Sequence, residues 1–125
     1  MDKNTLHYFL EADKIALGRA LKYPKFHDQI WKFQILLRKC EYYDIRKSIN
    51  LFARFSFYFY RYKYYKKGLL LGFSIPLHVF GPGLCIVHYG SIIINRNSKI
   101  GNNCRIHSGV NIGATGGSNK APPNW

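Results

Sequence analysis

Acidic residues are scarce in this sequence, and none of them follows Asp44. The 125-residue chain has 6 Asp and Glu residues against 19 Lys and Arg residues, and its formal net charge at pH 7 is +13. A carboxylate from the later part of the chain is therefore excluded from any catalytic site. The excess of positive charge fits three kinds of partner: nucleic acid, an anionic membrane surface, or a small molecule that carries phosphates.

Long apolar runs and paired cysteines are also missing. The longest strongly apolar run, Gly68 to Pro76, is far shorter than the roughly 20 residues that a membrane-spanning helix needs. The N-terminus is polar and lacks the apolar segment of a secretory signal. The chain has three cysteines, Cys40, Cys85 and Cys104. Their odd number and the lack of metal-ligand spacing favour reduced thiols. We therefore expect a cytoplasmic protein.

The first half of the chain has helical periodicity. With 47% hydrophobic residues, the chain has enough apolar surface for a packed core. Apolar residues at 3.6-residue spacing predict helices over about 6–21, 26–43 and 47–67. Asn4 or Thr5 is expected to cap the first helix, and Tyr23-Pro24 to end it. Residues 1–71 thus form a predicted helical N-terminal domain.

Two features of these helices leave alternatives open. Asp13 lies on the apolar face of the first helix, where a carboxylate either pairs with a neighbouring Arg or Lys or contacts a substrate. The third helix is crowded with Phe and Tyr among basic residues. Burial in the helical domain or in a subunit interface is favoured for it over contact with single-stranded nucleic acid or a membrane.

The second half has a six-residue period. Aliphatic residues recur at the first place of each repeat: Ile94, Ile100, Ile106 and Ile112. Mostly small or β-branched residues recur at the fifth place: Ser98, Cys104, Val110 and Gly116. A hexapeptide repeat of this kind is typical of a β-helix, and residues 82–117 would make two coils. We therefore predict an α+β chain with a β-helical domain over residues 72–125.

A resemblance to a known family comes from residues 72–117, which read GFSIPLHVFGPGLCIVHYGSIIINRNSKIGNNCRIHSGVNIGATGG. This stretch resembles the start of the catalytic domain of the serine acetyltransferases, which belong to the hexapeptide-repeat acyltransferases. It is most similar to a subgroup found among polysaccharide-synthesis genes. The resemblance implies a left-handed parallel β-helix and transfer of acetyl from acetyl-CoA to L-serine in cysteine biosynthesis. It also implies a homotrimer or a dimer of trimers, with no metal, no nucleic acid and no membrane.

The resemblance assigns His88 as the catalytic base. A histidine suits this role because its pKa lies near neutral and it can take the proton of a serine hydroxyl. The alternative is a hydrogen-bonded core histidine, because His88 falls on an inward place of the repeat. We also expect His107 to be either a substrate contact or a peripheral residue. A zinc site is not expected, because the histidine spacings do not match one.

The glycine-rich turn after the last repeat is the expected acetyl-CoA contact. It consists of Gly113, Ala114, Thr115 and Gly116, and its alternative is a plain tight turn without a ligand. The resemblance breaks off after Gly117, where relatives continue through further coils. We therefore expect the chain to be truncated and weak or inactive as an enzyme.

The sequence departs from the family at two places. No carboxylate precedes His88 at the place where the family has one to orient its histidine, and Ser74 stands near that place. After the glycine-rich turn, SNKAPPNW replaces a segment that resembles Asp-Arg-His-Pro in the family. Two alternatives therefore remain: a sugar O-acetyltransferase of the same class, and a non-catalytic fragment that forms trimers.

Overall fold

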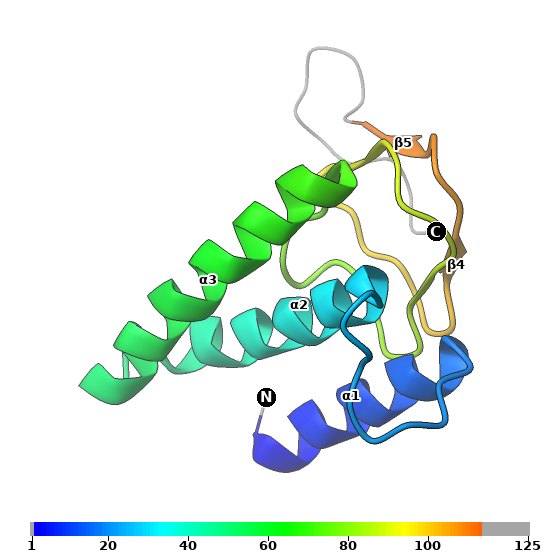
Figure 1. Cartoon of the computed structure of the whole chain (residues 1–125). Coiled ribbons are helices and arrows are strands. Elements are labelled where there is room, and N and C mark those ends of the chain that lie inside the picture. The colour runs from blue at the N-terminus through cyan, green and yellow to red at the C-terminus, as the bar shows by residue number, and fades with distance from the viewer. Residues whose placement is uncertain (1, 114–125) are drawn as a thin grey trace.

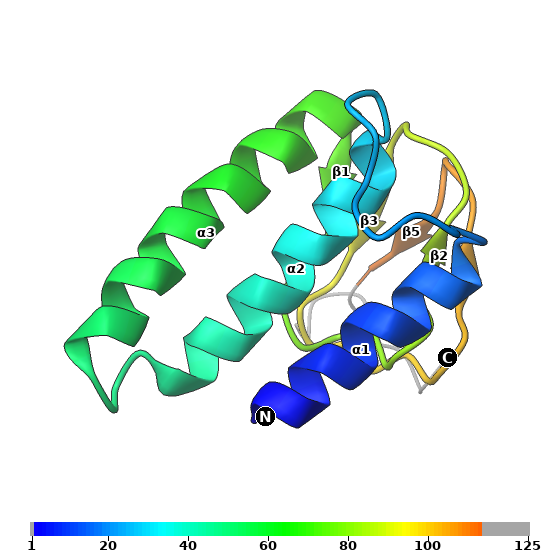
Figure 2. The same ribbon diagram turned by 60° about the horizontal axis from the view of Figure 1, so that its bottom comes forward.

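The computed structural model describes residues 2–113, which form three helices followed by five short strands. The helices are α1 (Lys3–Ala16), α2 (Gln29–Arg46) and α3 (Leu51–Leu71). The strands are β1 (Phe73–Ser74), β2 (Cys85–Ile86), β3 (Ile92–Ile94), β4 (Arg105–Ile106) and β5 (Asn111–Ile112). Helix α2 lies between α1 and α3, and the strands gather at one end of the helical layer (Figures 1 and 2).

Capping residues set the helix boundaries. The side chains of Asp2, Asp28 and Asn50 accept hydrogen bonds from backbone N–H groups in the first turns of α1, α2 and α3. The first cap is therefore Asp2 and not the predicted Asn4 or Thr5. Helix α1 is also shorter than predicted, because Gly18 adopts a φ of 70° two residues after its end. Gly72, with a φ of 83°, ends α3 in the same way.

The strands pair in parallel, and paired residues are 18 to 20 positions apart in the sequence, which is about three of the six-residue repeats. One sheet has the order β1-β3-β5, and the other contains β2 and β4. Their register joins Phe73 to Ile92 and Cys85 to Arg105. Each strand has only two or three residues, but backbone hydrogen bonds continue beyond the strand ends, as from the Gly81 N–H to the Ile100 carbonyl oxygen at 2.9 Å.

The prediction of a left-handed parallel β-helix is wrong. The described residues form a small α+β fold whose short strands lie in two separate sheets. The six-residue period did predict burial. The isoleucines at the first place of the repeat are 4–9% exposed: Ile94, Ile100, Ile106 and Ile112. Short parallel strands packed on a helix satisfy the same spacing, so the period identifies the inward side chains without specifying a closed coil.

A single apolar core joins the helices to the strands. Phe33 and Leu37 of α2 belong to the same buried cluster as Ile86 and Ile92. Beside this cluster, the buried Gln34 side chain donates to the carbonyl oxygen of Leu84 at 2.8 Å and accepts from the Ile86 N–H at 3.0 Å. The helix thereby covers the strands and satisfies their backbone groups.

The three helices have no membrane-spanning character. Within residues 2–113, no helix combines the length and the apolar composition that crossing a bilayer requires.

Candidate functional site

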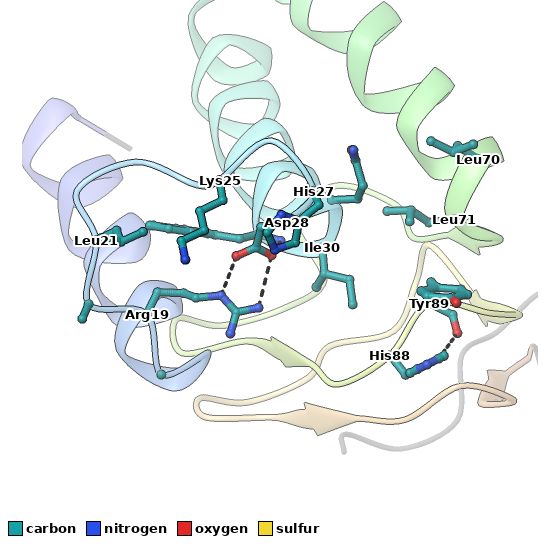
Figure 3. A pocket seen from close by; sticks show the side chains of 14 residues that line it. Arg19, Leu21, Lys25, His27, Asp28, Ile30, Leu70, Leu71, His88 and Tyr89 are labelled. Atoms are coloured by element: carbon teal, nitrogen blue, oxygen red, sulfur yellow. Dashed lines mark hydrogen bonds and ion pairs between the residues drawn. The ribbon is translucent and has the colours of Figure 1, made fainter.

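A pocket of about 740 Å³ lies where the loop between α1 and α2 faces the end of α3. The loop and the first turn of α2 form one wall, which includes Arg19, Lys25 and Asp28. Leu71 and the pair His88-Tyr89 form the opposite side. Figure 3 shows the charged residues on the loop side and His88 with Tyr89 on the strand side.

One ring nitrogen of His88 is bonded to the backbone, and the other is available. Its Nδ1 lies 2.7 Å from the backbone carbonyl oxygen of Tyr89 (Figure 3). Because a carbonyl oxygen only accepts, Nδ1 carries the proton when the ring is neutral, and Nε2 keeps its lone pair. Within residues 2–113, Nε2 has no hydrogen-bond partner. The ring also stacks on Tyr89, with 4.3 Å between centroids.

The position of His88 differs from the one that the six-residue repeat predicted. The repeat placed it inward, whereas the structure exposes its side chain directly after β2. A backbone carbonyl orients the ring, and within the described residues no carboxylate contacts it. Ser74, which stands near the family's carboxylate position, borders a different pocket.

An ion pair forms the opposite wall of the pocket. Arg19 Nε lies 2.6 Å from Asp28 Oδ2, and Arg19 Nη2 lies 3.2 Å from Asp28 Oδ1. Partial burial acts to raise the pKa of Asp28, but hydrogen bonds from Arg19 and the Trp31 N–H outweigh it and lower the pKa below its usual value. The wall therefore presents a charged carboxylate beside a guanidinium.

Cationic and apolar groups share the pocket, which suits a substrate with both characters. Arg19 and Lys25 supply positive charge, and Ile30 and Leu71 supply apolar surface. Ligands that combine an anionic group with an apolar part fit such a lining in chemical type.

Asp13 lies in the core and not in the His88 pocket. Its side chain is 3% exposed and forms a two-pronged ion pair with Arg38, with distances of 2.7 and 3.1 Å. Its Oδ1 also accepts from the N–H groups of Gly83 and Leu84 at 3.0 and 2.9 Å. This is the alternative in which the carboxylate pairs with a neighbouring arginine, and its oxygens are fully engaged.

The remaining predicted site residues are not gathered with His88. His107 is exposed after β4 and does not border the pocket. Gly113 is exposed at the end of the described residues, whereas Ala114, Thr115 and Gly116 lie outside them.

The cysteines do not offer a reactive thiolate in the core. Burial raises the pKa of Cys40 to about 12, and it also raises the pKa of Cys104. Among residues 2–113, no three His, Cys, Asp or Glu side chains gather as a metal site would require.

Sequence reasoning missed the charged wall of the pocket. Arg19, Lys25 and Asp28 lie in a segment that periodicity assigns partly to a helix and partly to a turn. The one available signal was Asp28, since an Asp just before an apolar helical stripe, which here begins at Ile30, is a typical N-cap. No family model, curated protein or solved structure matches this chain.

Proposed function

We propose that this protein is an acetyl-CoA-dependent O-acetyltransferase and that its acceptor is the hydroxyl group of L-serine. The observation that carries the proposal is the state of His88, which lines a pocket with Nδ1 bonded to a carbonyl oxygen and Nε2 available. The sequence resemblance over residues 72–117 supplies the reaction, and the pocket supplies a base of suitable type.

In the proposed reaction, Nε2 of His88 accepts the proton of the acceptor hydroxyl. The hydroxyl oxygen forms a bond to the thioester carbonyl carbon, and the carbon–sulfur bond then breaks. His88 returns the proton to the departing sulfur, and the products are O-acetylserine and coenzyme A. The Tyr89 carbonyl keeps the ring in the tautomer that this sequence of proton transfers requires.

The free cation of the pocket supports an acceptor that carries a carboxylate, as L-serine does. Arg19 and Asp28 are bonded to each other, and Arg19 Nη1 also donates to the Leu17 carbonyl oxygen at 2.8 Å. The Lys25 side chain has no such partner among residues 2–113, and its charge suits a carboxylate or a phosphate.

A sugar hydroxyl is the second candidate acceptor. It is favoured by one observation, the sequence SNKAPPNW at the place of the family's Asp-Arg-His-Pro-like segment. A sugar carries no charge that would call for the missing basic and histidine side chains.

Replacement of His88 tests the proposed base. We expect His88→Ala to lower the rate of coenzyme A release by about 10²–10⁴-fold, because the hydroxyl loses its proton acceptor. His107→Ala is the matched control, since His107 is exposed and lies outside the pocket, and its rate should stay within about twofold of the wild type. Wild-type turnover in His88→Ala would remove the assignment.

A further inference from the structure

A second pocket, of about 950 Å³, lies on another side of α3. Gly68 and Leu69 border it, whereas Leu70 and Leu71 border the His88 pocket. The end of α2 and the segments around β1 and β3 complete its lining. Among its apolar lining residues, Phe57, Phe73 and Ile75 are at most 7% exposed, so its apolar part is continuous with the core.

The lining of this pocket is positively charged. Among residues 2–113, its lining cations are Lys47, Arg61 and Arg96, and its one lining carboxylate is Asp44. Asp44 is already bonded to Lys47 at 2.8 Å and to the ring of His78 at 2.7 Å. Burial acts to raise the pKa of Asp44, but these two hydrogen bonds outweigh it, so that the pKa is lowered and the carboxylate stays charged.

Two arginines in the pocket lack such partners. Arg61 on α3 and Arg96 after β3 have no ion-pair or hydrogen-bond partner among residues 2–113. A guanidinium has a planar fork of donors that matches the oxygens of a phosphate. Two unpaired forks at one pocket are therefore suited to a ligand with more than one phosphate.

Aromatic rings flank one of these arginines. Tyr58 and Tyr65 lie three residues before and four residues after Arg61, so the three side chains share one side of α3. Both tyrosines are exposed, at 56% and 63%, and both line the same pocket as Arg61. Exposed aromatic rings beside cations provide stacking surfaces for planar bases.

We propose that this pocket binds a nucleoside diphosphate, with Arg61 and Arg96 at the phosphates and the base stacked on Tyr58 or Tyr65. The site is separate from the His88 pocket and does not depend on acetyl transfer. It accounts for two features of the sequence that acetyl transfer at His88 does not use, namely the tyrosines of α3 and part of the excess positive charge.

Calorimetric titration of the full chain with ADP, pyrophosphate and adenosine tests the site. We expect ADP to bind about tenfold or more tightly than either pyrophosphate or adenosine, because only ADP engages both the arginines and a ring. Absence of ADP binding would overturn the proposal. Much tighter binding of a single-stranded oligonucleotide than of ADP would also overturn the proposal, because the preferred ligand of the pocket would then be nucleic acid.

Substitutions separate this pocket from general charge attraction. Arg61→Gln should weaken ADP and pyrophosphate about tenfold. Tyr58→Ala combined with Tyr65→Ala should weaken ADP and leave pyrophosphate within about twofold. Lys63→Gln removes the same charge from the same helix outside the pocket, and it should change ADP affinity less than twofold. Equal losses in Arg61→Gln and Lys63→Gln would show that the net charge, and not the site, attracts the ligand.

Discussion

Arg38 is the side chain that holds α1, α2 and the strand region to one another. It is 0% exposed and forms ion pairs with Asp13 and Glu41. It also donates to the backbone carbonyl oxygens of Phe80 and Gly81 at 2.9 and 2.8 Å. Every hydrogen bond that Arg38 donates is charge-assisted, and the carboxylates of Asp13 and Glu41 both depend on its charge. The buried cluster of these three side chains is therefore stable only when all three are present.

Removal of this guanidinium should destabilise the fold strongly. In Arg38→Met, the carboxylates of Asp13 and Glu41 stay buried without their cation, at a cost of about 3–5 kcal/mol in the free energy of unfolding. Urea denaturation measures this loss. Arg105→Met is the matched control, because Arg105 is exposed on β4 and its loss should cost less than about 0.5 kcal/mol. A loss below about 1 kcal/mol in Arg38→Met would contradict the structural role.

At the scale of single residues, sequence reasoning predicted chemical type better than position. It identified the pairing of Asp13 with a basic side chain as one of two alternatives, because a charge on an apolar face needs a partner. It could not identify Arg38 as that partner, since 25 residues separate them and their contact depends on how α1 packs on α2. It also placed His88 inward, whereas the turn after β2 exposes it.

Helix α3 exposes an unusual amount of aromatic surface. It packs on α2 through a narrow stripe that includes Ala53 and Phe57. The opposite side carries aromatic residues at spacings of three, four and three, which are 58–75% exposed: Phe52, Phe55, Phe59 and Tyr62. Apolar residues at this spacing are typical of a helix face that packs against another helix.

We propose that this aromatic stripe packs against a second copy of the chain, within a homotrimer or a dimer of trimers. In sedimentation experiments, Phe55→Ala with Phe59→Ala should shift the assembly toward monomer. Phe26→Ala is the control, because Phe26 is 89% exposed and lies outside α3. Helix α3 carries basic and no acidic residues, so the copies repel, and association should strengthen as salt screens this repulsion. A well-folded wild-type monomer at micromolar concentration would contradict the proposal.

At the scale of elements, periodicity predicted the three helices and the buried isoleucines, but not the arrangement of the strands. Helix ends moved by a few residues because Asp2, Asp28 and Asn50 cap the helices and Gly18 ends the first one. The prediction of a left-handed β-helix was wrong because a period of six indicates that the repeated isoleucines point inward but does not specify the layer that covers them. In this fold, α2 supplies that layer with Phe33.

At the scale of the whole molecule, two pockets of different character border the core formed by residues 2–113. The His88 pocket holds a histidine, an ion pair and apolar surface, whereas the second pocket holds two arginines without a partner among the described residues, beside tyrosines. Both border the last turns of α3, so the packing of this helix on the strands determines both shapes. Sequence reasoning singled out His88 as a candidate but predicted neither pocket, because the pocket walls come from segments far apart in the chain.

The most direct test of acetyl transfer is an assay of coenzyme A thiol release by this chain. Acetyl-CoA is supplied with L-serine in one reaction and with simple sugars in parallel reactions. The account predicts weak release with L-serine that still exceeds the uncatalysed rate, little release with sugars, and loss of the serine-dependent rate in His88→Ala. Release with a sugar but not with L-serine would show that the acceptor is a sugar hydroxyl, the second candidate. No release with any acceptor from a stably assembled protein would contradict the enzymatic account and support a non-catalytic trimer-forming chain.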